Sequence, residues 1–185
     1  EIFVLDAFST DKTCEIALKY PCKVVQHEFK GFPQQRNYAL EHLPIKTDWI
    51  FFLDADEWLT EELREEIAQT IMMNPKENGF YIKRRFIWMR KWIKRGYYPT
   101  WLLRLFRSGK GYCEERAVNE HIIVEGKVGY LKNDIVHEDL KGITEWIARQ
   151  NRFASLEAEE LVKKNEDKYI EKSFFGFQAQ RKRWL

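Results

Sequence analysis

Short apolar runs and stretches of helical character alternate along the first part of the chain. The apolar runs predict strands, and the last of them, residues 48–53, is unbroken, as in a strand covered on both faces. Capping residues and prolines between the runs set the ends of three helices. The expected segments are strand 2–5, helix 11–20, strand 23–29, helix 34–43, strand 48–53 and helix 60–73. This βαβαβα order predicts an α/β fold with a mainly parallel sheet.

The second part of the chain has a different pattern. Turn residues separate several short strand-like pieces, and a periodic apolar stripe over residues 142–165 then predicts one long helix or two. The expected strands are 79–86, 101–107, 121–125, 128–131 and 134–137. A basic and aromatic tail, residues 173–185, closes the chain.

Composition narrows the class of protein. Hydrophobic residues make up 44% and aromatic residues 15% of the 185 positions, which excludes general disorder. No apolar run approaches the roughly 18 residues of a membrane span, and the start of the chain does not read as a signal peptide. Cys14, Cys22 and Cys113 form neither an even set nor a CxxC pair, so we expect no disulfide framework, no zinc knuckle and a reducing compartment.

The net charge of +2 conceals two segments of opposite sign. Residues 54–77 hold eight acids against two bases, whereas residues 78–113 hold ten bases, ten aromatic residues and no acid. Such segments set local fields that a whole-chain total does not reveal. A solvated surface is the ordinary explanation for one charged run, but 36 residues without a carboxylate favour a binding role.

Two aspartates follow the unbroken apolar strand. Asp54 and Asp56 flank Ala55 at its carboxyl end, the edge at which open α/β sheets bind ligands. On an extended backbone their side chains would point the same way, and two such carboxylates suit Mg²⁺ or Mn²⁺. The alternative is an acidic turn that only caps the next helix.

Six segments together resemble one protein family. The chain is similar to inverting family 2 glycosyltransferases with the GT-A fold, in particular to the bacterial branch that adds glucose or related sugars to the lipopolysaccharide core. The segments occur in the family's order over residues 1 to about 155: VLDAFSTDKT (4–13), GFPQQRNYAL (31–40), DWIFFLDADEWL (48–59), YYPTWLLRLFR (97–107), AVNEHIIVEGKVGYL (117–131) and IVHED (135–139). The resemblance implies a Rossmann-like three-layer fold with a C-terminal helical extension. The family's sheet begins with a further βα unit, which we do not find here.

The resemblance also divides the chain and assigns the donor site. It implies a GT-A domain at 1–140, with a nucleotide-sugar half at about 1–77 and an acceptor half at about 78–140, and an extension at 141–185. Within the first half the resemblance implies that Asp6 binds the nucleotide base, that Gln35 and Arg36 lie near the nucleotide, and that Asp54 contacts the ribose or the metal. It makes Asp56 the metal ligand. A turn acid and surface charges are the structural alternatives.

Inverting transfer needs a base that takes the proton of the acceptor hydroxyl as its oxygen attacks the anomeric carbon. Glu120 matches the acid of the family branch and is the favoured candidate, with Glu138 and Asp139 as alternatives. His137 matches a late histidine that serves some GT-A enzymes as a metal ligand. A hydrogen-bonded structural histidine is the other interpretation.

The implied function is a metal-dependent inverting glycosyltransferase. It would move a hexose from a nucleotide sugar, commonly a UDP-sugar, to a hydroxyl of a cell-envelope glycan or glycolipid such as lipopolysaccharide core, with Mg²⁺ or Mn²⁺. Aromatic and basic side chains of residues 78–113 and of the tail would meet the acceptor or the membrane surface. The expected location is cytoplasmic and peripheral to the inner face of the bacterial inner membrane, with no nucleic-acid partner.

Two other functions compete with this one. A metal-dependent nucleotidyl- or phosphotransferase also places acids at strand ends, but the chain has no GxGxxG or GxxxxGK[ST] phosphate loop. A non-catalytic membrane- or nucleic-acid-binding module would leave Asp54, Asp56 and Glu120 without a role. The QxxRW pattern at 180–184 matches processive synthases that carry transmembrane helices, and we take it as accidental.

Overall fold

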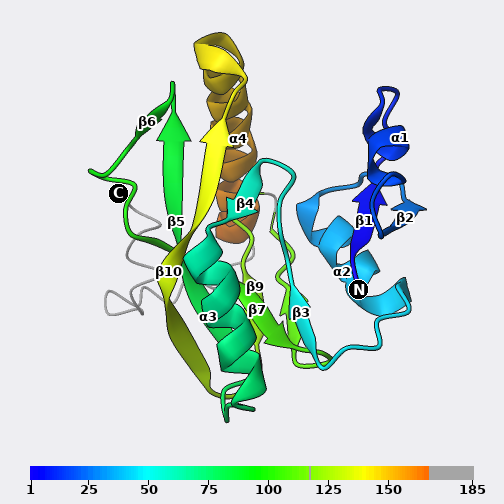
Figure 1. The fold of residues 1–185 in the computed structure, drawn as a ribbon. Helices are drawn as coiled ribbons and strands as arrows, with labels where there is room; N and C mark the ends of the chain where they lie inside the picture. The colour runs from blue at the N-terminus through cyan, green and yellow to red at the C-terminus, as the bar shows by residue number, and fades with distance from the viewer. Residues whose placement is uncertain (117, 167–185) are drawn as a thin grey trace.

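The structure, a computed structural model, describes residues 1–116 and 118–166, with the backbone alone for 163–166 (Figure 1). The tail and its QxxRW pattern lie outside the described residues. The elements are β1 (Phe3–Asp6), α1 (Thr13–Ala17), β2 (Lys23–Gln26), α2 (Phe32–His42), β3 (Trp49–Phe51), β4 (Glu57–Leu59), α3 (Glu61–Met72), β5 (Gly79–Trp88), β6 (Lys91–Trp92), β7 (Thr100–Arg107), β8 (Gly111–Cys113), β9 (Ile122–Val124), β10 (Val128–Asp139) and α4 (Gly142–Glu166).

The large sheet has the order β3-β7-β5-β10-β4, with β6 on β5. Only β10 and β5 run parallel in it, and the other four pairings are antiparallel. The α/β class is therefore confirmed, but the expectation of a mainly parallel sheet is wrong. The reason is that the acid-free segment folds back on itself. Residues 89–99 join β5 to β7 without a crossover helix, which allows antiparallel pairing, and β3 then pairs with β7.

The first two strands form a separate parallel pair, in which Phe3 lies opposite Lys23 and Asp6 opposite Gln26. Figure 1 shows this pair, with α1 and α2, beside the large sheet. β8 and β9 form a third, antiparallel pair.

Helix α3 covers one face of the large sheet, as its apolar stripe predicts. Thr60 caps it by accepting a hydrogen bond from the Leu63 backbone nitrogen at 3.2 Å, and Glu61 and Glu62 lie in the first turn, where negative charge is favourable. Leu63 is fully buried in a cluster with residues of β5, β7 and β10, namely Phe80, Ile82, Leu105, Leu131 and Ile135. Trp49, Phe51, Leu59, Ile67 and Ile71 pack around this cluster. Burial of each large side chain contributes roughly 2 kcal/mol to the free energy of unfolding. Since this cluster has more buried side chains than the second one described below, α3 and the large sheet form the main core.

A second apolar cluster joins β7 to the β8–β9 pair. Leu103, Phe106, Cys113 and Ile122 are buried in it, and Leu40 of α2 packs against them. This cluster ties α2 to the large sheet through β8.

Several predicted elements differ in extent from the observed ones. The expected strands 128–131 and 134–137 are one strand, β10, with a register irregularity between Tyr130 and Asp134. The strand expected at 48–53 ends at Phe51, and the short β4 was not expected. The last helix is continuous from Gly142 to Glu166. None of the described helices is long and apolar enough to cross a bilayer.

Candidate active site

The two aspartates of the DxD pattern lie in a tight turn between β3 and β4. The Glu57 backbone nitrogen donates to the Asp54 carbonyl at 3.0 Å, and the Asp54 backbone nitrogen donates to Glu57 Oε2 at 3.1 Å. Because the backbone turns here, the expected extended geometry is wrong. Asp54 contacts Arg36 and Arg104, whereas Asp56 contacts His137.

Asp54 lies between two arginines. Its Oδ1 accepts from Arg36 Nη2 at 2.9 Å and its Oδ2 from Arg104 Nη2 at 2.5 Å. Although burial raises the pKa of Asp54, the Arg104 and Arg36 guanidinium groups outweigh it and lower that pKa to about 2. Asp54 is therefore a fixed anion whose two oxygens are both already bonded.

Arg104 is itself buried, and it also donates to Glu57 Oε1 at 2.8 Å. Glu57 is buried too, and this burial raises its pKa above the ordinary value, against the effect of Arg104. Charges this deep persist only when they are paired, so Arg104 holds the DxD turn and the first residue of β4 together.

Arg36 connects this turn to the candidate general base. While its Nη2 bonds to Asp54, its Nη1 donates to Glu120 Oε1. Both Arg36 and Glu120 side chains are largely buried. The three side chains thus form a continuous chain, Asp54–Arg36–Glu120, from three separate parts of the sequence.

Two local features place Arg36 at this point. Gly31, at φ +146°, is the N-cap of α2, and a residue with a side chain would be strained in this backbone conformation. Asn37 then exchanges hydrogen bonds with the Cys113 backbone, donating at 2.9 Å and accepting at 2.8 Å. This pair fixes α2 against β8, and so it fixes Arg36 relative to the loop that carries Glu120.

Asp56 faces His137 of β10. His137 Nε2 lies 3.1 Å from Asp56 Oδ2, and this hydrogen bond lowers the pKa of Asp56. The Glu138 backbone nitrogen also donates to the Asp56 carbonyl at 3.2 Å, and the Phe86 ring packs on His137 at 5.2 Å. Two of the predicted metal ligands, 81 residues apart, are therefore brought together.

His137 also has a buried atom without a partner. Its Nδ1 has no hydrogen-bond partner among the described residues, so the imidazole hydrogen-bonds through Nε2 to Asp56 alone. A carboxylate and an imidazole in contact form a donor set that Mn²⁺ accepts, and Mg²⁺ commonly takes one or two carboxylates together with substrate phosphates. No group of three or more acidic, histidine or cysteine side chains among the described residues is arranged to hold a metal alone. Asp56 and His137 thus fit a cation whose remaining ligands come from substrate.

The residues expected to bind the nucleotide lie in the first part of the chain. Asp6 is buried at the end of β1, where its Oδ2 accepts from the Ser9 backbone nitrogen and from Gln26 Nε2, both at 3.0 Å. Hydrogen bonds from Ser9 and Gln26 lower the pKa of Asp6 well below its usual value. Gln35 instead bonds to His27, with Oε1 2.8 Å from the ring Nδ1 and Nε2 donating to the carbonyl at 3.4 Å. Its amide therefore stabilises the β2–α2 connection in this structure.

The two alternative bases have different surroundings. Asp139 is buried and accepts from Arg149 and from the Lys141 backbone nitrogen, the latter at 3.1 Å. Burial raises the pKa of Asp139, but the Arg149 hydrogen bond outweighs this and leaves it lowered. Glu138 is half-buried, and its carboxylate makes no hydrogen bond or ion pair with a described residue. Asp139 therefore joins β10 to α4.

Three residues of this site were not singled out from the sequence. Arg104 and Glu57 fix the turn, and Arg84 lies on β5 with its Nε buried and without a hydrogen-bond partner among the described residues. Burial lowers the pKa of Arg84, and the carboxylates of Glu57 and Asp54 act against this. A charged residue inside an otherwise apolar strand, as in LLRLF at 102–106, was the available signal.

An acidic turn at the end of the half-buried strand β3, a mixed sheet and a C-terminal helix are typical of a GT-A-type glycosyltransferase domain. A crystal structure of residues 1–349 of TarS from S. aureus shares the fold, with a TM-score of 0.53 at 18% identity over 75% of this chain and 51% of that chain. The chain belongs to glycosyl transferase family 2, whose family model matches residues 1–128.

Relatives with curated names support the same assignment. A lipopolysaccharide core biosynthesis glycosyltransferase, LpsC, of Rhizobium meliloti (strain 1021) is 30% identical over 174 residues, covering 88% of this chain and 62% of that protein. An uncharacterized glycosyltransferase of Rickettsia felis is 26% identical over 175 residues, covering 88% of this chain and 61% of that protein. The chain thus spans about three fifths of the length of these relatives. The family resemblance inferred from the six segments is confirmed.

Proposed function

We propose that the chain forms the catalytic part of a metal-dependent inverting glycosyltransferase. It would move a hexose from a UDP-sugar to a hydroxyl group of a cell-envelope glycan or glycolipid. The observation that carries this proposal is the Asp54–Arg36–Glu120 chain, which joins the DxD turn to a carboxylate from a distant loop. A donor site and a proton acceptor would then be held in one rigid arrangement, as group transfer requires.

The donor would lie across the DxD turn. Asp56 and His137 would hold Mg²⁺ or Mn²⁺, which supplies positive charge to the diphosphate leaving group when it is bound. Asp54 is bonded by two arginines, so we assign it a contact with the ribose rather than a metal bond. Asp6, buried at the end of β1, would bind the base of the nucleotide, and Gln35 and Arg36 would border the same pocket.

Glu120 would be the general base. Its Oε1 is held by Arg36, so the carboxylate has one fixed orientation, and Oε2 makes no hydrogen bond with a described residue. That oxygen would take the proton of the acceptor hydroxyl while the hydroxyl oxygen attacks the anomeric carbon. Glu138 is the alternative, because Asp139 is already committed to Arg149.

The acceptor half would bind a glycan or glycolipid at the membrane surface. The named function of LpsC in lipopolysaccharide core biosynthesis supports this class of acceptor. The segment that joins β5 to β7 carries exposed cations and half-exposed rings, including Lys91, Trp92, Lys94, Arg95 and Tyr97, and such segments favour anionic lipid surfaces. Co-sedimentation with vesicles tests this part: retention on anionic vesicles above neutral ones is expected, and equal retention contradicts it.

The main test uses an Asp56→Asn variant. Release of UDP from a panel of UDP-sugars, with Mn²⁺ and an acceptor extract, should fall by about 100-fold or more, since one ligand of the metal site is lost. Asp48→Asn is the matched control, because Asp48 is an exposed acid of the same strand region, and it should keep wild-type turnover. If the two variants lose activity equally, or if the product carries a transferred phosphate or nucleotide rather than a sugar, the proposal fails.

A further inference from the structure

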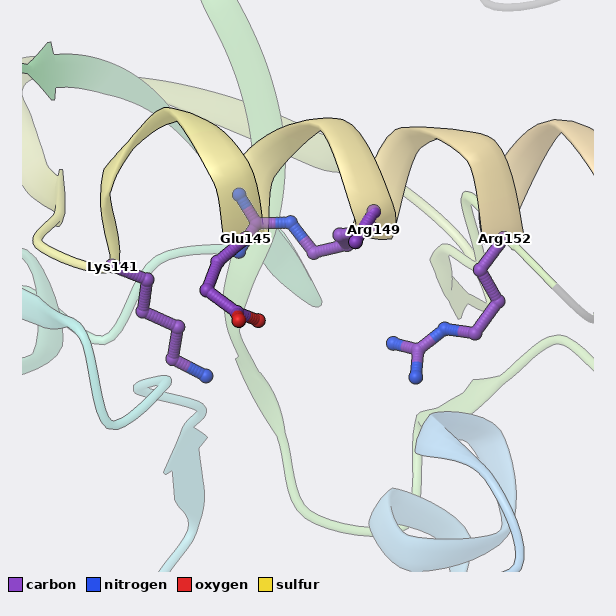
Figure 2. Close-up of a pocket in the computed structure, with 5 residues that line it drawn as sticks. Lys141, Glu145, Arg149 and Arg152 are labelled. Atoms are coloured by element: carbon purple, nitrogen blue, oxygen red, sulfur yellow. The ribbon is translucent and has the colours of Figure 1, made fainter.

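Helix α4, which follows β10, carries a pocket that has no role in the site described above. It is an open hollow of about 370 Å³ lined by Lys141, Glu145, Ala148, Arg149 and Arg152, of which all but the half-buried Arg149 are exposed. Figure 2 shows the side chains of Glu145 and Arg152 extending from one side of α4, together with that of Lys141 just before the helix, while the Arg149 guanidinium is turned back toward the start of the helix. The lining thus brings together three cations and one acid.

The charges in this pocket are not balanced by its own acid. Glu145 and Arg149 are four residues apart on one helix face, a spacing at which ion pairs form, but no such pair is present. Arg149 bonds instead to the buried Asp139. Neither Lys141 nor Arg152 has an ion-pair partner among the described residues, and the guanidinium of Arg152 lies 5.7 Å from the Phe153 ring.

The pocket begins just after the end of β10, the strand that contacts the DxD turn. Asp139, which fixes Arg149, is two residues beyond His137, about 7 Å along an extended strand. The residue between them, Glu138, donates its backbone nitrogen to the carbonyl of Asp56. Arg149, which lines the pocket, is therefore anchored by the same end of β10 that positions Asp56 and His137.

We propose that this pocket binds an oxyanion, a phosphate or carboxylate group, of one of the two substrates. The inference rests on the proposed function, because a sugar nucleotide and an acidic acceptor both bring oxyanions to this end of the sheet. Arg149, held in place by Asp139, provides a preformed donor, and Lys141 and Arg152 supply two further charges that charge-assisted hydrogen bonds can use. The diphosphate of the donor and an acidic sugar of the acceptor are the two sources.

The experiment measures binding without turnover, on the 185-residue chain. The variant is Lys141→Gln with Arg152→Gln, and the matched control is Lys46→Gln with Lys110→Gln, which removes two exposed charges elsewhere. Inorganic pyrophosphate should bind the wild type and the control equally and the variant about tenfold more weakly, because two charge-assisted contacts are lost. A Glu145→Gln variant, which removes the only acid of the pocket lining, should bind pyrophosphate more tightly than the wild type.

Two further titrations identify the source. If the variant loses affinity for UDP but not for uridine, the pocket serves the donor diphosphate. If it loses affinity for galacturonate but keeps that for galactose and UDP, the pocket serves an acidic acceptor sugar. Equal binding of pyrophosphate by the variant and the control, or no effect of Glu145→Gln, would overturn the proposal. These titrations measure binding and not sugar transfer. A failure of the proposed function would appear in a different experiment, as the absence of turnover that Asp56→Asn abolishes.

Discussion

One face of the large sheet contains an apolar region, packed against α3, and an ionic region around the DxD turn. On three strands, a residue of the apolar region and a residue of the ionic region are only two positions apart. On β5, Ile82 lies in the apolar core and Arg84 lies at the ionic site. On β10 the same step leads from Ile135 to His137, and on β4 it leads from Leu59 to Glu57. Side chains two residues apart on a strand share a face, so no bend or loop separates the regions.

The two regions depend on their neighbours in different ways. Leu63, Phe80 and Ile82 contribute by being removed from water, and any apolar neighbour of suitable shape would serve. Arg104 and Glu57 are removed from water at a cost, and each needs its particular partner. Because well-packed apolar residues could replace buried ion pairs without loss of stability, the ionic region supports the proposal that the active site lies there.

The first way to test this contrast is to remove the arginine at the centre of the ionic region. Arg104→Met should lower the free energy of unfolding by about 4 kcal/mol, because the carboxylates of Glu57 and Asp54 would be left without their shared partner. Urea unfolding followed by tryptophan fluorescence measures the change. Arg64→Met is the control: Arg64 forms an exposed pair with Glu61, and its loss should leave the free energy of unfolding nearly unchanged. Equal losses in the two variants would contradict the distinction.

The second test removes packing from the apolar region. Leu63→Ala should lower the free energy of unfolding by about 3 kcal/mol through lost burial and the cavity left behind. Met72→Ala, on the same helix but with 85% of the residue exposed, should change it by less than about 0.5 kcal/mol. Turnover per folded molecule should stay near the wild-type value for Leu63→Ala, since no site residue changes. A selective loss of turnover would mean that the two regions are coupled.

The third and smallest effect is a dependence of stability on pH. The pKa of Asp54 is lowered from 3.8 to about 2 in the folded protein, so its ionised form stabilises the fold above pH 3.8, and this contribution is lost as the pH falls through about 2. Wild type and Asp54→Asn should therefore differ in unfolding free energy near neutral pH and converge as the solution is acidified through that window. A gap that stays constant over the window would show that the arginines do not stabilise the Asp54 carboxylate.

Glu57 should act in the opposite direction. Burial raises the pKa of Glu57, so the stability linked to its protonated form is present below its unfolded value of 4.5 and is lost as the pH rises through the folded value. A Glu57→Gln variant measured beside Asp54→Asn separates the two contributions.

The elements that were predicted correctly depend on local signals. The Thr60 cap and the Leu63, Ile67 and Ile71 stripe are a few residues apart, and α3 has the expected position. Sheet pairing depends on contacts between distant segments, which explains why a mainly parallel sheet was expected and a mixed one is found. The same reason explains why β4, three residues long, has no recognisable signal of its own.

The sequence by itself determined the α/β class and the family, because local motifs carry both, and it predicted a metal site at the DxD pattern. Only the tertiary structure decided the partners of that turn: Arg36 with Glu120, 84 residues apart, Arg104 with Asp54, 50 apart, and Asp56 with His137, 81 apart. Each of these contacts depends on which strands lie beside one another, and strand order is fixed by the packing of the whole core rather than by any segment of the chain.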